Sequence, residues 1–491
     1  MIRRLVPTIL ALVVSAIFSS QQSVFADAFH PVKPKGYLND RIEIELAMQL
    51  DPKDAQTLES LAQFPGLKPL AELLRSAGAK LQPSVPEELG RKLRFFSYYT
   101  VRLKGPTELP KLLKLVNLAR KLGPLTIKRA GLVPSTRPPT DPYVGTGRPV
   151  KRDPVLLPFG TQWYLNVTGV DTAWNCTATG AGVVVADVDW GFDLNHAELQ
   201  GQYEPSRVYN FCSGPSPGAL TQGLAGQPNA YTFHGTGVAG LIAALHDGVG
   251  TQGIAFGAKI WPLQAACSAI GGEQCDESLV DGNPWAAAVS TVTAADCGGC
   301  RKVVLIEGQT CGKKSIESSI AVNGAIQTAI ANNVVVVVAA GNGGKDASTD
   351  DHGDPFTATG AIIVGSTGYS DDHALDVVSN YGANIVVSAP GDSANDLTLT
   401  APPWKCALEP GGAAYTACFG GTSGAAAKVA GVVALMLEKN PKLTPADVKE
   451  ILSRPTRGAV GAGSSRPGGA FLDAAGAVAA ADANGCQAPL P

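Results

Sequence analysis

One serine, Ser423, stands at the start of an apolar helical pattern near the C-terminus. It lies in the stretch Phe-Gly-Gly-Thr-Ser-Gly-Ala-Ala-Ala-Lys-Val-Ala-Gly, residues 419–431. A serine at a helix N-terminus ordinarily caps free backbone N–H groups, but the same groups also stabilise an anion formed beside it. The glycines before it allow another backbone to approach closely, which a cap does not need. The stretch therefore predicts either a cap or a nucleophile, and partner residues must decide.

Three upstream motifs supply the partners that a nucleophilic serine needs. Asp189 follows the apolar run Val183–Val188, His234 precedes Gly-Thr-Gly at a helix start, and Asn342 stands in Ala-Ala-Gly-Asn-Gly-Gly after an apolar strand. Amide hydrolysis requires a nucleophile, a base that takes its proton, a group that orients the base, and donors for the oxyanion. The four motifs contain one residue type for each of these roles.

In this order, Asp, His, Asn and Ser, the motifs resemble those of the subtilisin-like serine peptidases. The resemblance extends from about residue 162 to about residue 478. It implies that Ser423 attacks the scissile carbonyl and that His234 accepts the serine proton. It further implies that Asp189 orients the imidazole, and that Asn342 with the Ser423 backbone N–H binds the oxyanion.

Each assignment competes with an alternative. Asp187 and Asp193 stand in the same stretch as Asp189, which we prefer because Asp189-Trp190-Gly191 matches the Asp-x-Gly pattern of the family. Asn342 is also explained by a left-handed turn. His234 alone among the histidines precedes Gly-Thr-Gly at a helix start, and the others are His30, His196, His246, His352 and His373.

Two departures from the family pattern bear on substrate binding and packing. The family often has proline and histidine after the serine, where this chain has Ala427 and Lys428, so we expect altered helix packing. Ile-Glu-Gly-Gln, residues 306–309, replaces the Ser-Leu-Gly of the family's substrate-binding strand. The resemblance implies that Glu307 and Gly308 in this stretch, and Gly341 beside Asn342, contact substrate.

Glu307 has three readings. If it faces the pocket, its charge favours Lys or Arg before the cut; if it faces the other sheet surface, apolar residues are preferred. A shift of one residue in register reverses the face. The third reading is a solvated strand end.

The elements that must position these residues alternate between apolar strands and helices. We expect a doubly wound, mainly parallel α/β sheet with helices on both faces. The expected strands are 183–188, 259–264, 302–307, 334–339, 361–365 and 384–388. The expected helices are 235–245, 279–294, 315–332, 423–438 and 444–452.

The N-terminal third differs in charge from the rest. Residues 1–150 hold 22 basic and 12 acidic side chains, whereas residues 151–491 hold 17 and 30. Opposite charge suggests that the two parts bind each other. Nucleic acid is not an expected partner, because basic residues do not alternate with aromatic ones.

Residues 1–26 read as a secretory signal peptide, with two arginines, a short apolar run and a cut after Ala26. Residues 27–152 are predicted to form a small α+β segment with helices at 58–74 and 109–122 and a strand at 95–103, and a Pro/Gly-rich linker extends from 131 to 158. The resemblance implies that this segment is a propeptide. The family resemblance implies that this segment inhibits the catalytic domain, residues 153–491. The alternative is an independent binding domain.

The ten cysteines form an even set in a chain expected to be exported, which predicts up to five disulfides. Cys406–Cys418 and Cys267–Cys275 are the expected local pairs. Cys297-Gly-Gly-Cys300 has a zinc site or free thiols as alternatives, and one such pair is weak support for zinc.

The sequence thus predicts a secreted, monomeric serine endopeptidase that acts on proteins or peptides, without stable membrane association. No cofactor is expected; many relatives bind structural calcium, but no ligands can be named. The alternatives are a non-catalytic binding protein on the same fold and a metal-dependent hydrolase using Asp350, Asp351, His352 and Asp354. The latter cluster lacks a ligand helix and reads as a surface loop.

Overall fold

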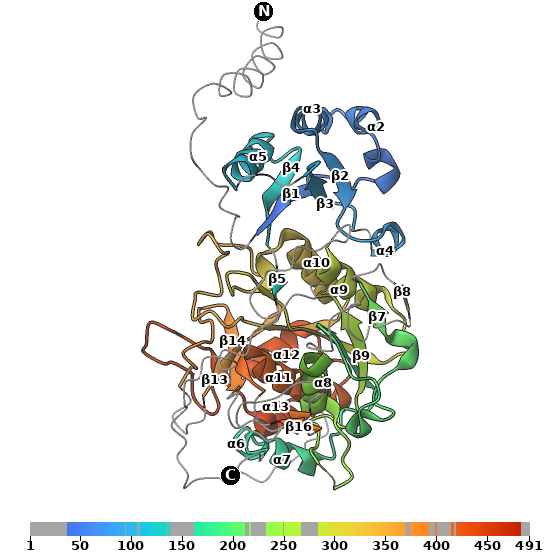
Figure 1. The fold of residues 1–491 in the computed structure, drawn as a ribbon. Coiled ribbons are helices and arrows are strands. Elements are labelled where there is room, and N and C mark those ends of the chain that lie inside the picture. Colours follow the sequence, from blue (N-terminus) through green and yellow to red (C-terminus); the bar gives the residue numbers. More distant parts are fainter. Residues whose placement is uncertain are drawn as a thin grey trace, which may run out of the picture.

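A computed structural model of the chain shows a small N-terminal domain seated on a larger α/β domain (Figure 1). It describes residues 37–93, 95–105, 107, 109–134, 136–137, 162–211, 216–217, 232–248, 250–266, 283–368, 374–391, 398–399, 414–416 and 419–482. The expected signal peptide lies outside these residues.

The larger domain is built on a nine-stranded sheet in which every neighbouring pair is parallel except β7–β8. The strands are short and rich in β-branched residues, which suits strands covered on both faces. In spatial order they are β17 (Ala470–Phe471), β14 (Ile385–Pro390), β13 (Ile362–Thr367), β12 (Val335–Ala339), β10 (Arg301–Ile306), β6 (Val183–Asp189), β9 (Lys259–Gln264), β7 (Tyr209–Asn210) and β8 (Ser216–Pro217).

Helices cover both faces of this sheet, so the expected α/β architecture is confirmed. Alternate residues of each strand enter separate cores, as Val185 and Val184 of β6 do. One core packs under α8 (Thr232–Ala243), α11 (Gly421–Lys439) and α13 (Ala474–Ala481). The other packs under α9 (Pro284–Ala294) and α10 (Ile320–Ala331). Shorter helices are α6 (Tyr164–Val167), α7 (Val170–Ala173) and α12 (Pro445–Leu452).

The N-terminal domain is an antiparallel sheet in the order β2-β3-β1-β4, with its own apolar core. Ile42, Ile44 and Leu46 on alternate positions of β1 enter that core, beneath the longer helices. Its elements are β1 (Tyr37–Leu46), α2 (Leu58–Ala62), α3 (Lys68–Ala77), β2 (Lys80–Pro83), α4 (Glu87–Leu93), β3 (Tyr98–Arg102), α5 (Leu109–Lys121) and β4 (Ile127–Pro134).

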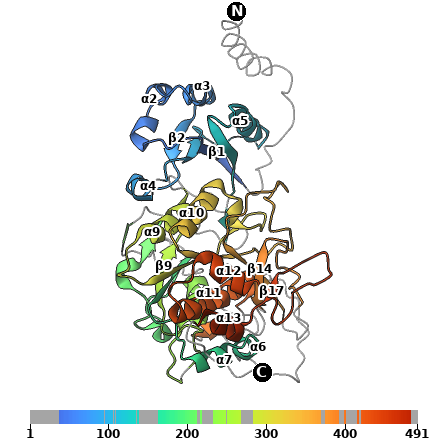
Figure 2. The same cartoon turned by 180° about the vertical axis from the view of Figure 1, so that it is seen from behind.

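The opposite face of this small sheet packs on α10 of the larger domain (Figure 2). Alternation puts the charged positions of β1 on that face. Glu43 there is 1% exposed and accepts hydrogen bonds from Asn283 Nδ2 at 2.8 Å, Ser319 Oγ at 2.9 Å and the Ala321 backbone N–H at 3.1 Å. Asn283 and Ser319 are the N-caps of α9 and α10, so one carboxyl joins both helix starts.

A short strand that follows the N-terminal domain pairs with the region of the candidate catalytic motifs. β5 (Thr136–Arg137) pairs antiparallel with β11 (Gln309–Thr310), placing Arg137 opposite Gln309. A second small hairpin joins β15 (Thr398–Leu399) to β16 (Tyr415–Thr416).

Several expected boundaries differ from the structure. The expected helix 58–74 is divided into α2 and α3, because Pro65-Gly66 interrupts the helical pattern. Residues 131–134, expected to begin the linker, complete β4. The expected helix 315–332 is divided into a 3-10 turn, Ile316–Ser318, and α10.

Cys297 and Cys300 form a disulfide between α9 and β10, so neither zinc nor free thiols explain that pair. Cys176 and Cys311 are also disulfide-bonded. The expected pairs Cys406–Cys418 and Cys267–Cys275 lie outside the described residues. Within the described ranges, no helix has the length and hydrophobicity needed to cross a membrane.

Candidate active site

Asp189 and His234 meet at the carboxyl end of the sheet. Asp189 is the last residue of β6 and has no exposed surface. His234 lies in the first turn of α8, and its Nδ1 is 2.7 Å from Asp189 Oδ1 and 2.8 Å from Oδ2. The Trp190 backbone N–H also donates to Asp189 Oδ1 at 2.6 Å. These bonds fix the carboxylate and leave the imidazole Nε2 as the nitrogen able to take up a proton.

Aromatic rings and a glycine hold the imidazole in place. The His234 ring centroid lies 5.2 Å from that of Phe419 and 5.7 Å from that of Trp190. A Cβ at Gly235 would lie 2.6 Å from the Gly191 carbonyl oxygen. The close approach of α8 to the strand-end turn therefore requires glycine at this position.

Ser423 occupies the first turn of α11, as expected from the sequence, and is 1% exposed. Phe419, four residues earlier, contacts the imidazole and so joins the serine loop to His234. Within the described part of the chain, Ser423 Oγ makes no hydrogen bond. The structure thus bonds Asp189 to His234 and brings the serine loop beside them.

Asn342 is held against the residues that precede the serine. Its Oδ1 accepts from the Thr422 backbone N–H and from Thr422 Oγ1, both at 2.9 Å. Its backbone N–H donates to Gln309 Oε1 at 2.8 Å. Gly421 has φ +63°, and a Cβ there would lie 3.0 Å from the Asn342 amide atoms. Because Oδ1 is occupied by Thr422, the Nδ2 donor is the part of the amide offered to a ligand oxygen.

Sequence reasoning missed the residues that shape the Asn342 loop. Asn380 Nδ2 donates to the carbonyl oxygens of Lys313 and Ala340, at 2.6 and 2.7 Å, and its Oδ1 accepts from the Gly343 backbone N–H. Asn380 lies just before β14, far from the motifs, and no local pattern signals its role. Gln309 belongs to the Ile-Glu-Gly-Gln stretch that departs from the family pattern. That departure was the sequence feature that could have pointed to its role in holding the Asn342 loop.

Glu307 follows β10 and is fully buried, so the reading as a solvated strand end is wrong. Burial raises the pKa of Glu307 well above its ordinary value, and the charge of Asp189 raises it further. The nearby Ser423 hydroxyl opposes this rise, although no hydrogen bond of ordinary geometry joins the two groups. A raised pKa favours the neutral carboxyl, which attracts Lys or Arg less than a carboxylate would.

The two glycines expected to contact substrate occupy tight positions. A Cβ at Gly308 would lie 2.8 Å from Ile316 Cδ1, and a Cβ at Gly341 would lie 2.6 Å from Asn380 Nδ2. Gly341 also has φ +97°, a conformation that favours glycine. Their contact with substrate stays a prediction.

Lys428 replaces the family histidine inside α11 and has no exposed surface. Its Nζ donates to the Pro390 carbonyl oxygen at 2.8 Å and lies 4.4 Å from the centroid of the Tyr164 ring. The departure from the family pattern therefore changes packing between α11, the end of β14 and α6, as expected.

The acidic loop considered as a metal site forms turns instead. Asp351 accepts from Thr310 Oγ1 at 2.7 Å and from the Gly312 backbone N–H at 3.0 Å. Asp350 Oδ1 accepts from the backbone N–H groups of His352 and Asp354. Over the residues that can be described, no group of three or more His, Cys, Asp or Glu side chains could hold a metal ion.

Comparisons with known proteins agree with this geometry. The sequence profile described as "Subtilase family" matches residues 180–470. An extracellular protease of Xanthomonas campestris pv. campestris is 34% identical over 351 residues, covering 65% of this chain and 56% of that protein. Subtilisin E of Bacillus subtilis is 30% identical over 279 residues, covering 56% of this chain and 60% of that protein. The chain thus spans little more than half of these relatives.

Two solved structures share the fold. A protease of Pseudoalteromonas arctica PAMC 21717 aligns with a TM-score of 0.50 at 29% identity, covering 65% of this chain and 97% of that chain. Fervidolysin of Fervidobacterium pennivorans, a keratinolytic enzyme related to subtilisin, aligns with a TM-score of 0.59 at 20% identity. That alignment covers 91% of this chain and 62% of that one, so it includes part of the N-terminal domain.

Proposed function

The chain belongs to the subtilase family, and on that premise we propose that it is a secreted serine endopeptidase made as an inhibited proenzyme. The observation that carries the proposal is the Asp189–His234 pair, bonded at 2.7 and 2.8 Å and set beside the serine loop of α11. No cofactor enters the chemistry, and we name no calcium ligands.

In the proposed mechanism Ser423 attacks the scissile carbonyl while His234 Nε2 takes its proton. Asp189 holds the imidazole by its Nδ1 and stabilises the imidazolium that forms. The imidazolium then returns the proton to the leaving amine, and water hydrolyses the acyl-enzyme by the same steps. Asn342 Nδ2 and the Ser423 backbone N–H stabilise the oxyanion, and the α11 dipole favours the same charge.

The N-terminal domain is proposed to inhibit the catalytic domain before it is removed. The buried bonds of Glu43 to the starts of α9 and α10 support tight docking. The pairing of Arg137 with Gln309 supports a path of the chain toward the candidate site, because Gln309 bonds the Asn342 backbone. We propose a first cut between about residue 137 and residue 159, a window given by the composition of the linker.

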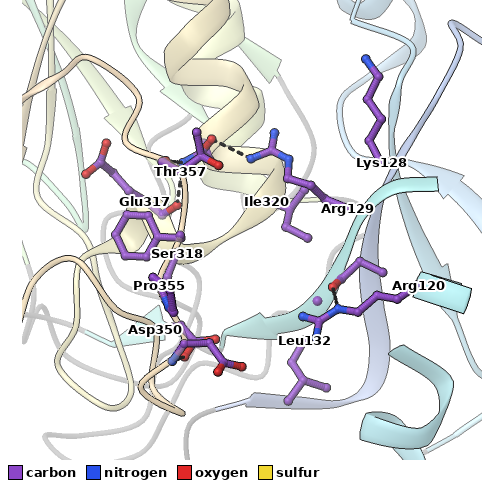
Figure 3. Close-up of a pocket in the computed structure, with 15 residues that line it drawn as sticks. Arg120, Lys128, Arg129, Leu132, Glu317, Ser318, Ile320, Asp350, Pro355 and Thr357 are labelled. Carbon is purple, nitrogen blue, oxygen red and sulfur yellow. Dashed lines mark hydrogen bonds between the residues drawn. The ribbon is translucent and has the colours of Figure 1, made fainter. Parts of the chain in front are cut away.

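The interface between the two domains also contains a cavity, which is consistent with the proposed removal of the N-terminal domain. A cavity of about 300 Å³ lies between the domains (Figure 3). Arg120 and Arg129 of the N-terminal domain line one side, and Asp350 and Asp354 of the larger domain line the other. Arg129 crosses the boundary and donates to Asn323 Oδ1 at 2.9 Å. The opposed charges support electrostatic attraction between the two domains.

Export is proposed from the signal-like N-terminus and from relatives named extracellular proteases. The proposed substrates are proteins or peptides, with Gly308 and Gly341 as backbone contacts, and the proposed mature enzyme is a monomer.

The deciding experiment is active-site labelling with a fluorophosphonate, followed by peptide mapping. Label is expected on Ser423 alone, and Ser423→Ala is expected to lose both label and casein hydrolysis while folding normally. Ser318→Ala, at a 3-10 turn away from the site, is the matched control and keeps both. Activity in Ser423→Ala contradicts the mechanism, and a folded wild type that neither takes label nor hydrolyses casein favours the non-catalytic alternative.

A further inference from the structure

Glu307 lies beside the candidate catalytic carboxylate, one strand away. The parallel register of β10 and β6 pairs Ile306 with Val188, and the Glu307 backbone N–H donates to the Val188 carbonyl oxygen at 3.1 Å. Val303 and Leu305 of β10 enter the core beneath α11. Because side chains alternate along a strand, Glu307 points to the same face, toward the start of α11.

This carboxyl group is buried without hydrogen-bond partners. Glu307 is 0% exposed, and neither carboxyl oxygen makes a hydrogen bond to any residue that the structure describes. Buried polar groups are ordinarily paired, and an unpaired buried carboxylate is costly. The group is therefore expected to be a neutral acid, and the burial that raises its pKa acts in the same direction.

The Ser423 hydroxyl is the group that faces this acid. It adjoins the Glu307 carboxyl, and its Oγ is equally without a hydrogen bond among the described residues. A hydroxyl and a neutral carboxylic acid that are neighbours and lack other hydrogen bonds are able to form one with each other. Two unsatisfied polar groups at one position suggest a contact that is completed during function.

We propose that Glu307 is a positioning residue for Ser423. Its neutral carboxyl donates a hydrogen bond to Ser423 Oγ, which fixes the nucleophile and leaves the serine O–H free to donate to His234 Nε2. This inference rests on the proposed peptidase function. When Glu307 loses its proton, the carboxylate accepts the serine O–H instead and turns it away from the imidazole. A negative charge beside the forming oxyanion also opposes the reaction.

The charged and titratable groups around Glu307 favour its protonated, neutral form. On β6, Asp189 and the fully buried Asp187 both present acidic groups, and burial with these neighbours raises the pKa of Asp187 as well. From α8, His234 is bound to Asp189. On α11, Lys428 is directed to the Pro390 carbonyl oxygen and the Tyr164 ring. The negative charge of Asp189 resists a second ionisation, so Glu307 loses its proton at a higher pH than an ordinary glutamate does.

The test compares steady-state kinetics of mature wild type, Glu307→Gln and Glu307→Leu from about pH 5 to about pH 11. Wild type is expected to lose kcat on an alkaline limb. Glu307→Gln keeps a donor that cannot ionise, so it retains kcat within about threefold at neutral pH and lacks that limb. Glu307→Leu is expected to lose about a hundredfold in kcat with KM changed by less than about threefold.

Asp187→Asn is the matched control, since it removes a buried acid on the same face without removing the Ser423 contact. Its pH profile is expected to equal that of wild type. An alkaline limb that persists in Glu307→Gln, or a wild type without one, overturns the proposal. Equal loss of kcat in the Gln and Leu variants also overturns it, because that result indicates packing alone. If Glu307→Leu fails to fold, the pH profile of Glu307→Gln decides.

The same experiment separates this inference from the proposed function. Residual hydrolysis in Ser423→Ala would contradict the peptidase mechanism itself. Hydrolysis that depends on Ser423 but ignores Glu307 would contradict only the positioning role.

Discussion

The domain interface and the floor of the candidate active site each bury a glutamate, and the surroundings of the two differ. Glu43 accepts hydrogen bonds from three donor groups at the starts of two helices, with shortest distances of 2.8, 2.9 and 3.1 Å. Glu307 makes no hydrogen bond with the described residues and has two aspartates for neighbours. Burial raises the pKa of both groups; several donor groups oppose the rise for Glu43, whereas only the Ser423 hydroxyl opposes it for Glu307.

The comparison teaches that burial alone does not define what a carboxyl group does. Helix N-termini supply donors and a favourable dipole, so the Glu43 site suits binding across an interface. A site without donors selects the neutral acid, which can donate a hydrogen bond and changes character when it ionises. The following predictions test that distinction, from the largest expected effect to the smallest.

Glu43→Ala should break the interface side of the comparison. The substitution leaves the Ser319 hydroxyl and the Ala321 backbone N–H without this acceptor, at a cost of about 1–3 kcal/mol for each buried donor left unpaired. Asn283 Nδ2 loses one of its two acceptors and keeps Ser319 Oγ. The separated N-terminal domain is then expected to inhibit the mature enzyme about a hundredfold less tightly or worse. Inhibition constants measured with a peptide substrate check this.

Glu43→Gln keeps an acceptor oxygen and is expected to weaken inhibition less than alanine does. Glu59→Ala, an exposed residue of α2, is the matched control and should leave inhibition unchanged. An inhibition constant for Glu43→Ala within about twofold of wild type would show that the interface does not depend on this carboxyl.

Asn342→Ala should test the proposed oxyanion role of a residue whose hydrogen-bond partners the structure shows. Its amide is anchored by Thr422, so its loss removes a positioned donor rather than a mobile one. Turnover is expected to fall by about 10²–10³-fold, the loss reported for removal of one such donor in subtilisin itself. Steady-state kinetics check this, with the exposed Asn332→Ala as control. A change confined to KM would contradict an oxyanion role.

Glu317→Gln extends the comparison to a third buried glutamate, whose carboxyl group has fewer hydrogen-bond donors than that of Glu43 but more than that of Glu307. Burial raises the pKa of Glu317 from 4.5 to about 7, while a hydrogen bond from Thr359 Oγ1 opposes the rise. The folded state therefore binds the proton more tightly than the unfolded state. The contribution of Glu317 to the free energy of unfolding is greatest below about pH 4.5 and is lost as pH rises through about 7, by about 3 kcal/mol.

Glutamine does not titrate, so the stability of Glu317→Gln relative to wild type should grow by that amount over the same pH window. Denaturant unfolding at both ends of the window, in a Ser423→Ala background that prevents autolysis, measures it. Glu450→Gln on the exposed side of α12 should show no such growth. If the stability difference between Glu317→Gln and wild type does not change with pH, the pKa of Glu317 is not raised in the folded protein.

Salt should have the smallest effect. The N-terminal part of the chain is basic and the remainder acidic, so screening should weaken inhibition by the separated domain. The expected loss between low and high ionic strength is less than about tenfold, because the buried Glu43 contacts are screened poorly. Titrations of inhibition against salt check this, and tighter inhibition at high salt would contradict charge attraction.

The sequence predicted much of the α/β domain because its strands are continuous apolar runs. Val334 to Ala339 needs no partner to be recognised as a buried strand, and the four motifs stand at strand ends and helix starts where folding leaves polar groups available. The same local logic failed at residues 58–74, where apolar periodicity extends across Pro65-Gly66 although the helix does not.

Other features depend on contacts that lie far apart in the chain. The alternation Arg-Ile-Glu-Ile-Glu-Leu in β1 predicts a sheet with one solvent-exposed polar face. Glu43 on that face is buried only because the other domain covers it. The face of Glu307 was ambiguous because a single residue of register reverses it, and the pairing of β10 with β6 decides it. Asn380 positions the Asn342 loop through bonds that no local pattern contains.

Lys428 carries a consequence for the evolution of the fold. Its buried ammonium group contacts the Pro390 carbonyl oxygen and the Tyr164 ring. The fold therefore accommodates a lysine at this position only with the help of residues from two other elements. Lineages that exchange histidine for lysine here are expected to retain an aromatic ring at the position of Tyr164, since an aliphatic substitute would leave a cation beside hydrocarbon. Lineages with histidine are free of that constraint. The two positions should therefore change together, and ancestral sequences should gain the ring before the lysine.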